Sequence, residues 1–326
     1  MKNNICKSLW IFLFALVFGG LSLTAYAQGG NQYIFPGITT NNNITIGNLN
    51  PVDTTAQVNF YDNSGKLNSL SVDLPHGQQQ RVNPASVSLT TFTGSVVITA
   101  PVPLSVSADQ FEGNTAFDFI YPASLGSTLL IPFTGAEVAS VDVNVFNPGP
   151  NQAEVKVVLV QSNGAHTTTR TATLDPLHST TITLSSGTSA SYVFVTTANI
   201  LRPVSPVAAS AVIRNFNPSA AVTGAAARTD IAFATSTSTD IYTPKTQVPF
   251  FTQGPDYFSL VQVDNLTNAQ QTILVSATQA DGTPFPGTSN PATVVLPPYA
   301  STRQEMAQLF GSTNTTFSMG TITAVA

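Results

Sequence analysis

The chain has 326 residues and a formal net charge of −5, and only 8% of its residues are charged, against about 25% in ordinary soluble domains. The acidic balance excludes nucleic acid as a partner, because binding to phosphates calls for a basic patch. Hydrophobic residues make up 42% of the chain, which predicts a folded protein whose surface is rich in Thr, Ser, Asn and Gln.

Residues 1–27 have the features of a secretory signal peptide. Lys2 and Lys7 give the segment a positive start, an apolar run follows, and Ala25 and Ala27 are the small residues of a cleavage site. The alternative is a membrane anchor, but the run is shorter than the roughly 20 apolar residues of a spanning helix. Cleavage after Ala27 is therefore expected, and the predicted localisation is secreted or at the cell surface.

Cleavage would change the chemistry of the mature chain. The only cysteine, Cys6, leaves with the signal peptide, so no disulfide can form within the mature chain. Nine basic residues then face 16 acidic residues, which gives a formal charge of −7. No later stretch is long and apolar enough for a transmembrane helix. The fold is therefore expected to depend on the burial of apolar side chains.

Three stretches of the mature chain repeat one order of strands and turns, each on the order of 100 residues long. Each opens with an aromatic or apolar residue beside a proline ("YIFPG", "LLIPF", "QVPFF"). An alternating strand then ends at Asn50, Asn147 or Asn265, and a second strand leads to a glycine turn ("DNSG", "QSNG", "ADG"). A third strand enters a proline corner, and a further strand follows ("GSVVITA", "SYVFVTTA", "MGTITAVA").

This order resembles the immunoglobulin-like β-sandwich repeats of bacterial secreted and surface proteins, many of which have no known activity. The resemblance implies an all-β fold with three tandem immunoglobulin-like sandwiches after the signal peptide. One short helix is expected in "STRQEMAQLF", with Thr302 as its cap and Glu305 in a capping box. The expected division is a signal peptide at 1–27, a first sandwich at 28–113, a connector at 114–128, a second sandwich at 129–216, an Ala/Ser/Thr-rich connector at 217–246, and a third sandwich at 247–326.

The three units differ after their fourth strand. The first two add a proline-marked strand that ends near Phe111 and Phe216, whereas the third has no counterpart after "MGTITAVA". Three explanations stay open: closure by another segment of the chain, truncation, or an acceptor for a partner strand. For the acceptor, Tyr33 and Phe35 are the candidate donor residues of the mature N-terminus. The candidate acceptor edge is formed by Thr321, Ile322, Thr323, Ala324 and Val325.

No motif in the chain specifies a reaction. The three histidines lack the spacing of metal ligands, and no Cys can join them. The acids of the turns at Asp62 and Asp281 lack the pattern of a calcium loop, and no G-x-S-x-G nucleophile elbow is present. No catalytic, metal or cofactor site is therefore predicted, and a hydrolase with an unrecognised carboxylate pair is the weakest alternative.

The leading interpretation is a secreted, non-enzymatic structural or adhesive protein that acts by display, adhesion or self-assembly. Its expected partners are copies of itself or other cell-surface proteins. The alternative is a module that binds carbohydrate or extracellular matrix, with Tyr257 and Phe258 as an aromatic binding surface. Against that alternative, the same two aromatic residues are well placed to pack in the core of the third sandwich.

Overall fold

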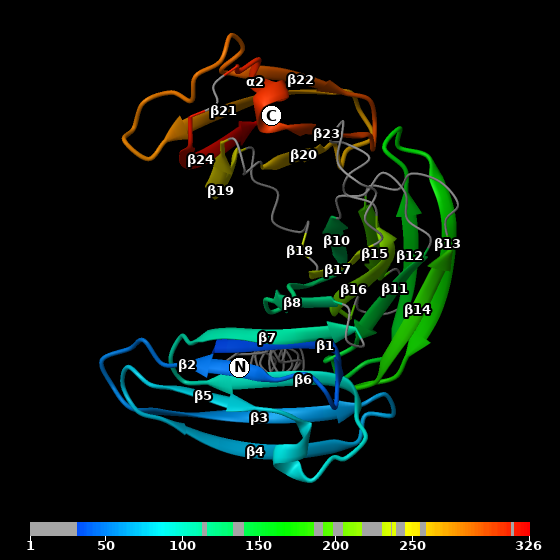
Figure 1. Ribbon diagram of the computed structural model, residues 1–326. Helices are drawn as coiled ribbons and strands as arrows, with labels where there is room; N and C mark the ends of the chain where they lie inside the picture. The colour runs from blue at the N-terminus through cyan, green and yellow to red at the C-terminus, as the bar shows by residue number, and fades with distance from the viewer. Residues whose placement is uncertain are drawn as a thin grey trace, which may run out of the picture.

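The computed structural model of the protein is all-β, as expected, and every sheet is antiparallel (Figure 1). The predicted signal peptide at 1–27 lies outside the described residues. The structure describes residues 31–112, 116–132, 140–185, 192–197, 205–216, 230–235, 237–238, 245–254, 259–313 and 316–326.

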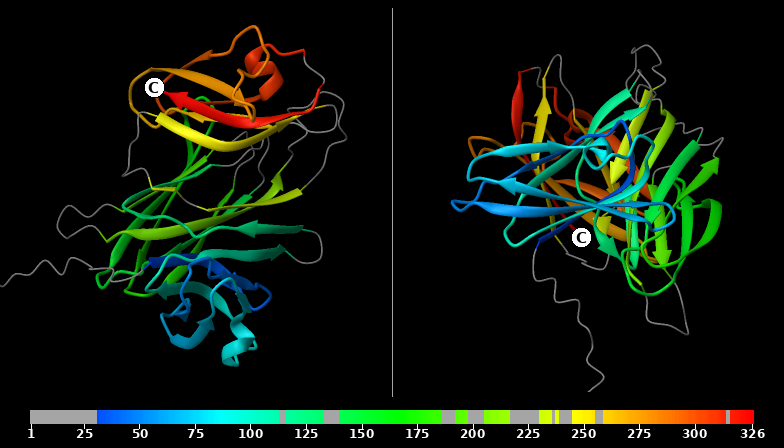
Figure 2. Two further views of the ribbon diagram at one scale, coloured as in Figure 1. Left: turned by 90° about the vertical axis from the view of Figure 1, so that its left-hand side faces the viewer. Right: turned by 90° about the horizontal axis from the view of Figure 1, so that it is seen from below.

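The described strands form three successive pairs of sheets, and a hydrophobic cluster lies between the two sheets of each pair (Figures 1 and 2). We call them the first, second and third sheet pair. Alternation along the strands explains this packing: in β3, Ala56, Val58 and Phe60 are fully buried in the first cluster. The face of a sheet that points away from its own cluster is called its outer face.

The first sheet pair consists of two four-stranded sheets. Its first sheet has the order β1 (Asn31–Thr39), β6 (Thr93–Ala100), β3 (Thr54–Asp62) and β4 (Leu67–Leu74). Its second sheet has the order β5 (Gln79–Val82), β2 (Ile44–Gly47), β7 (Ser105–Glu112) and β8 (Ala116–Ile120). A short 3-10 helix, η1 (Pro84–Val87), follows β5.

The second sheet pair repeats this plan with additional short strands. Its first sheet has the order β13 (His166–Leu174), β12 (Ala153–Val160), β15 (Tyr192–Thr197), β10 (Thr128–Pro132) and β18 (Thr237–Ser238). Its second sheet has the order β14 (Ser179–Ser185), β11 (Ser140–Phe146), β16 (Val207–Phe216) and β17 (Asp230–Thr235), and β9 (Leu125–Gly126) also pairs with β16. The two segments expected as connectors thus contribute β8 and β17, which extend the second sheets from β7 and β16.

The third sheet pair has a complete first sheet and a smaller second sheet. The first sheet has the order β19 (Lys245–Gln253), β24 (Ser318–Val325), β21 (Gln271–Gln279) and β22 (Ala292–Leu296), and the second contains β20 (Leu260–Asp264) and β23 (Ser301–Glu305).

The expected helix of this unit is shorter than predicted. It is α2 (Met306–Phe310), because residues from Ser301 onward pair with β20 as strand β23. Glu305 occupies the cap position without a side-chain hydrogen bond, so neither Thr302 nor a capping box starts the helix. Met306, Leu309 and Phe310 are buried, as the sequence predicted.

One buried asparagine occupies the same place in each sheet pair: Asn48, Asn147 and Asn265. Each side-chain Nδ2 donates to the carbonyl four residues further on, at 2.7–2.8 Å. Each also donates to the last carbonyl of the strand before the proline corner, at 2.9–3.2 Å. A buried amide needs such partners, so these contacts fix two loops together. The asparagine of the first unit that is equivalent to Asn147 and Asn265 is therefore Asn48, and not Asn50 as predicted from the sequence.

Candidate functional site at the β20 edge

The second sheets of the three pairs differ at one edge. β2 lies between β5 and β7, and β11 lies between β14 and β16. In the third pair, β20 pairs with β23 along its whole length, and no other strand in the described part of the chain pairs with it. An antiparallel strand with one neighbouring strand turns alternate backbone N–H and C=O groups toward its other side, where a further strand could pair. We call this side of β20 the β20 edge.

The hydrophobic cluster is also less covered near the β20 edge. β20 turns Val261 and Val263 toward the third cluster, and both side chains are only partly buried. Ala324 of β24, which packs against the same cluster, is likewise only partly buried. The positions that match Val261 and Val263, counted from the buried asparagine, are fully buried in the other two pairs: Ile44, Ile46, Val143 and Val145.

The edge predicted from the sequence, Thr321 to Val325, lies elsewhere. These residues belong to β24, which is hydrogen-bonded to β19 on one side and to β21 on the other, so they do not form an edge. Ile322 and Ala324 face the third cluster, and the alternate residues Thr321, Thr323 and Val325 are on the outer face. The sequence prediction did not identify β20 as the edge. The available signal was that the last strand of the first two units pairs with the first alternating strand of its unit, which is β20 in the third unit.

The predicted donor residues are part of the first sheet pair. Tyr33 and Phe35 belong to β1, which pairs with β6, and Phe35 is fully buried in the first cluster. The Tyr33 hydroxyl accepts a hydrogen bond from the Leu104 N–H at 2.5 Å. These residues are therefore not free to add to another sheet while the first pair is folded. The predicted aromatic surface, Tyr257 and Phe258, lies outside the described residues.

Asp264 ends β20 on the outer face and lies close to the second sheet pair. Burial raises the pKa of Asp264 to about 6, and the hydrogen bond from Gln262 Nε2, at 2.9 Å, only partly offsets this. Burial and the nearby charge of Asp264 also raise the pKa of Tyr192. The Tyr192 hydroxyl donates to the Tyr299 carbonyl at 2.5 Å, so β20 sits next to a hydrogen-bonded contact between two sheet pairs.

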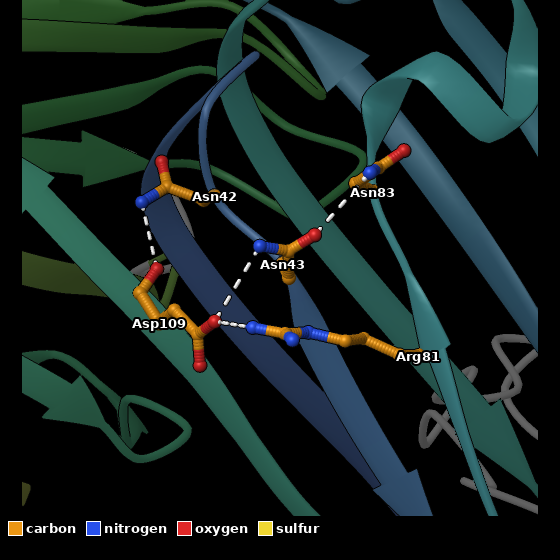
Figure 3. Close-up of polar contacts among 5 residues, drawn as sticks. All are labelled: Asn42, Asn43, Arg81, Asn83 and Asp109. Atoms are coloured by element: carbon orange, nitrogen blue, oxygen red, sulfur yellow. Dashed lines mark hydrogen bonds and ion pairs between the residues drawn. The ribbon is translucent and has the colours of Figure 1, made fainter.

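A polar cluster in the first sheet pair is the other concentration of charge (Figure 3). Asp109 is almost fully buried and forms an ion pair with the exposed Arg81. Asn43 donates to the Asp109 carboxylate and accepts from Asn83, while the buried Asn42 donates to the Asp109 carbonyl at 2.7 Å. The side chains come from the β1–β2 loop, β5, the start of η1 and β7. These hydrogen bonds hold the β1–β2 loop against β7, so the cluster is explained by its structural role.

The acids of the glycine turns are occupied by their own turns. Asp281 accepts the N–H and hydroxyl of Thr283 at 2.9 and 2.7 Å, and these bonds lower its pKa. Asp62 accepts the same two groups of Ser64. Over the ranges that the structure describes, no three His, Cys, Asp or Glu residues lie together as a metal-binding group.

A cavity of about 560 Å³ opens between β22 and β23, beside the turn at Ser162 of the second pair. Its lining combines hydroxyl and amide side chains with Val, Leu, Ala and Pro, and none of the lining residues is ionisable. This cavity therefore offers no general acid or base from its own walls.

Two comparisons with known proteins place the chain in no family. No protein-family model matches it, and no curated protein matches it. Within the described ranges, no helix has the length and hydropathy needed to cross a membrane.

Proposed function

We propose that the chain is a secreted, non-enzymatic structural protein of three immunoglobulin-like sandwiches, and that the third sandwich binds a β-strand from another polypeptide. The observation that carries this proposal is the β20 edge. Every other central strand of the second sheets has a neighbour on both sides, and β20 has one among the described strands. Strand addition at such an edge uses main-chain hydrogen bonds for affinity and alternate side chains for specificity.

The equivalent strands of the first two pairs define the chemistry of the missing neighbour. β7 and β16 run antiparallel to β2 and β11, and they turn small or branched aliphatic side chains toward the clusters. In β7 these side chains are Val106 and Ala108, and in β16 they include Val207, Ala209 and Ala211. A strand for β20 should therefore run antiparallel to it and alternate Val or Ala with polar residues, which would cover Val261 and Val263.

A peptide with the sequence of residues 102–111, which spans most of β7, tests the proposal on the full chain. We expect saturable binding that raises the midpoint of thermal unfolding, because a ligand of the folded state stabilises it by mass action. Hydrogen exchange of the β20 amides should slow on binding.

The matched control is the same peptide with Val106→Asp and Ala108→Asp, which keeps the backbone but places charges against the cluster. It should neither bind nor change the exchange of β20. The proposal is wrong if both peptides bind equally, if neither binds at about 1 mM, or if the protected amides lie outside β20 and its neighbours.

A further inference from the structure

The first and second sheet pairs contact each other through a glycine turn and a proline corner. The Ser179 N–H, just after the corner, donates to the Asn63 carbonyl in the turn at 3.4 Å. The Ser179 hydroxyl also meets the Ser95 hydroxyl of β6 at 2.8 Å. Leu177, which has a φ of +64° in the corner, packs in a cluster that includes Tyr61.

The second and third sheet pairs repeat this contact with the equivalent residues. The Ser301 N–H donates to the Ser162 carbonyl in the turn at 2.9 Å. Tyr192 of β15, whose neighbour across the strands is Val160, donates its hydroxyl to the carbonyl of Tyr299 at 2.5 Å. Tyr299 has a φ of +56° and thus occupies the place of Leu177. We call Leu177 and Tyr299 the corner residues.

The space around the glycine of each turn shows how closely the proline corner of the next sheet pair approaches that turn. A Cβ on Gly65 would lie 3.3 Å from the Leu177 carbonyl oxygen, and a Cβ on Gly164 would lie 2.5 Å from the Pro298 carbonyl oxygen. All three turns close in the same way, with the glycine N–H donating to the carbonyl three residues earlier. A Cβ on Gly282, in the third turn, would meet no described atom within 4 Å. The third turn is therefore the same element without a corner against it.

The outer face beside this third turn is also uncovered and partly apolar. Thr278 and Thr321 pair across β21 and β24 at the positions of Val160 and Tyr192. On the same face, Leu274 pairs with Val325, and these side chains are 44% and 40% exposed. The matching outer faces of the first two pairs contain buried apolar residues in clusters: Ile34, Val97, Val158, Val160 and Tyr192.

The first sheet pair does not supply the complementary surface. Where the other pairs have a corner residue, its corner has Gly77, with a φ of +71°, and a Cβ there would meet no described atom within 4 Å. Gly47 stands at the β2 position that matches Phe146, which packs against Tyr61 with ring centroids 5.6 Å apart. A second copy of this chain therefore lacks the large corner residue that both existing contacts have, and it lacks the aromatic side chain that Phe146 supplies to the first contact.

We propose that the third glycine turn and the outer face of β21 and β24 form a docking site for a further sandwich, one with a large apolar residue at a positive-φ corner. The partner is defined by that chemistry, and an unchanged copy of this chain does not fit it. This inference extends the structural role to a second surface. It rests on the repeated contact between sheet pairs and is independent of the β20 edge.

The test converts the first sheet pair into such a partner in the full chain. A donor variant carries Gly47→Phe and Gly77→Leu, which give it the apolar groups of the second pair, and Thr321→Lys, which blocks its own docking site. The unchanged chain has the docking site without a corner residue. We expect light scattering to show a one-to-one complex of the two chains, whereas the unchanged chain does not associate with itself through this surface.

Two controls distinguish docking at this site from non-specific association. A donor with Gly77→Ala in place of Gly77→Leu has a similar backbone constraint without the large side chain, and it should bind at least about tenfold more weakly. A chain with only Thr321→Lys should not bind the donor, yet should still bind the β7 peptide at the β20 edge.

The inference is overturned if a folded donor shows no complex with the unchanged chain at about 1 mM, or binds the Thr321→Lys chain equally well. A second donor without Gly47→Phe keeps the test decisive if the phenylalanine disturbs β2. Loss of peptide binding would instead count against the strand proposal, so failures of the two proposals are distinguishable.

Discussion

The fold changes the ionisation of Asp264, at the end of β20. Its carboxyl is buried at the end of β20, and its pKa is raised from an ordinary value of 3.8 to about 6. Between these values the folded chain binds more protons at this site than the unfolded chain does. The contribution of Asp264 to stability is therefore greatest below pH 4 and falls as the pH rises through 6.

Replacement of Asp264 by Asn should remove this dependence. Asp264→Asn keeps an oxygen that accepts from Gln262 but carries no charge, so its thermal unfolding midpoint should exceed that of the unchanged chain at pH 7 and match it near pH 4. The control is Asp73→Asn on the exposed side of β4. An equal gain at both pH values, or an equal effect of the control, would contradict the assignment.

The buried asparagines show what the sequence does and does not determine at this scale. The sequence marks the end of each first alternating strand with an asparagine, and this is confirmed for Asn147 and Asn265. In the first unit two asparagines lie two residues apart, and the sequence alignment selected Asn50. Asn48 is the equivalent residue because its amide reaches the Val52 and Leu74 carbonyls. That choice depends on a strand distant in sequence, which local pattern does not report.

Glycine turns that look alike in sequence differ in their surroundings. Gly65, Gly164 and Gly282 all have a φ between +79° and +87°, so a side chain at any of them costs about 1–2 kcal/mol from backbone strain. They differ in the space for a Cβ, which decreases from Gly282 through Gly65 to Gly164.

Alanine at each turn should therefore rank the contacts between sheet pairs. Gly282→Ala should cost only the backbone strain, and Gly164→Ala should cost about 1–3 kcal/mol more, because its Cβ would overlap a backbone carbonyl. Gly65→Ala should fall between them, since the atom nearest to its Cβ is in the movable side chain of His178. Urea unfolding of the full chains measures this order, and equal costs for Gly164→Ala and Gly282→Ala would disprove it.

The strands were largely predictable from sequence, but their neighbours were not. Alternation located β3, β12 and β21, because one face of each strand is buried and the other is wet. The same reasoning predicts a free edge at Thr321–Val325, since a counterpart of β7 and β16 in the third unit would follow these residues in sequence. That strand would pair with β20 and not with β24, as β7 pairs with β2. Strand pairing across a sandwich is non-local, so order in the chain did not identify the edge.

In the whole molecule, the surface that each sheet pair offers to the next pair differs from the surface that it offers to the preceding pair. Each contact joins the first sheet of one pair to the proline corner of the next. Leu177 is the corner residue in the first contact, and Tyr299 is the corner residue in the second. The first pair has Gly77 at its corner, whereas the third pair presents an uncovered turn and outer face. The two proposed binding surfaces, the β20 edge and this outer face, thus both belong to the third sheet pair.

Residue-resolved amide hydrogen exchange of the full chain tests the β20 edge by comparing the amides of β2, β11 and β20. β2 and β11 have neighbours on both sides, so their amides should be protected continuously. β20 has one neighbouring strand among the described strands, so exchange should be slow at amides bonded to β23 and faster at Leu260 and Asp264, which alternate with them. Equally slow exchange along the whole of β20 in the monomeric chain would show that β20 offers no edge to a further strand.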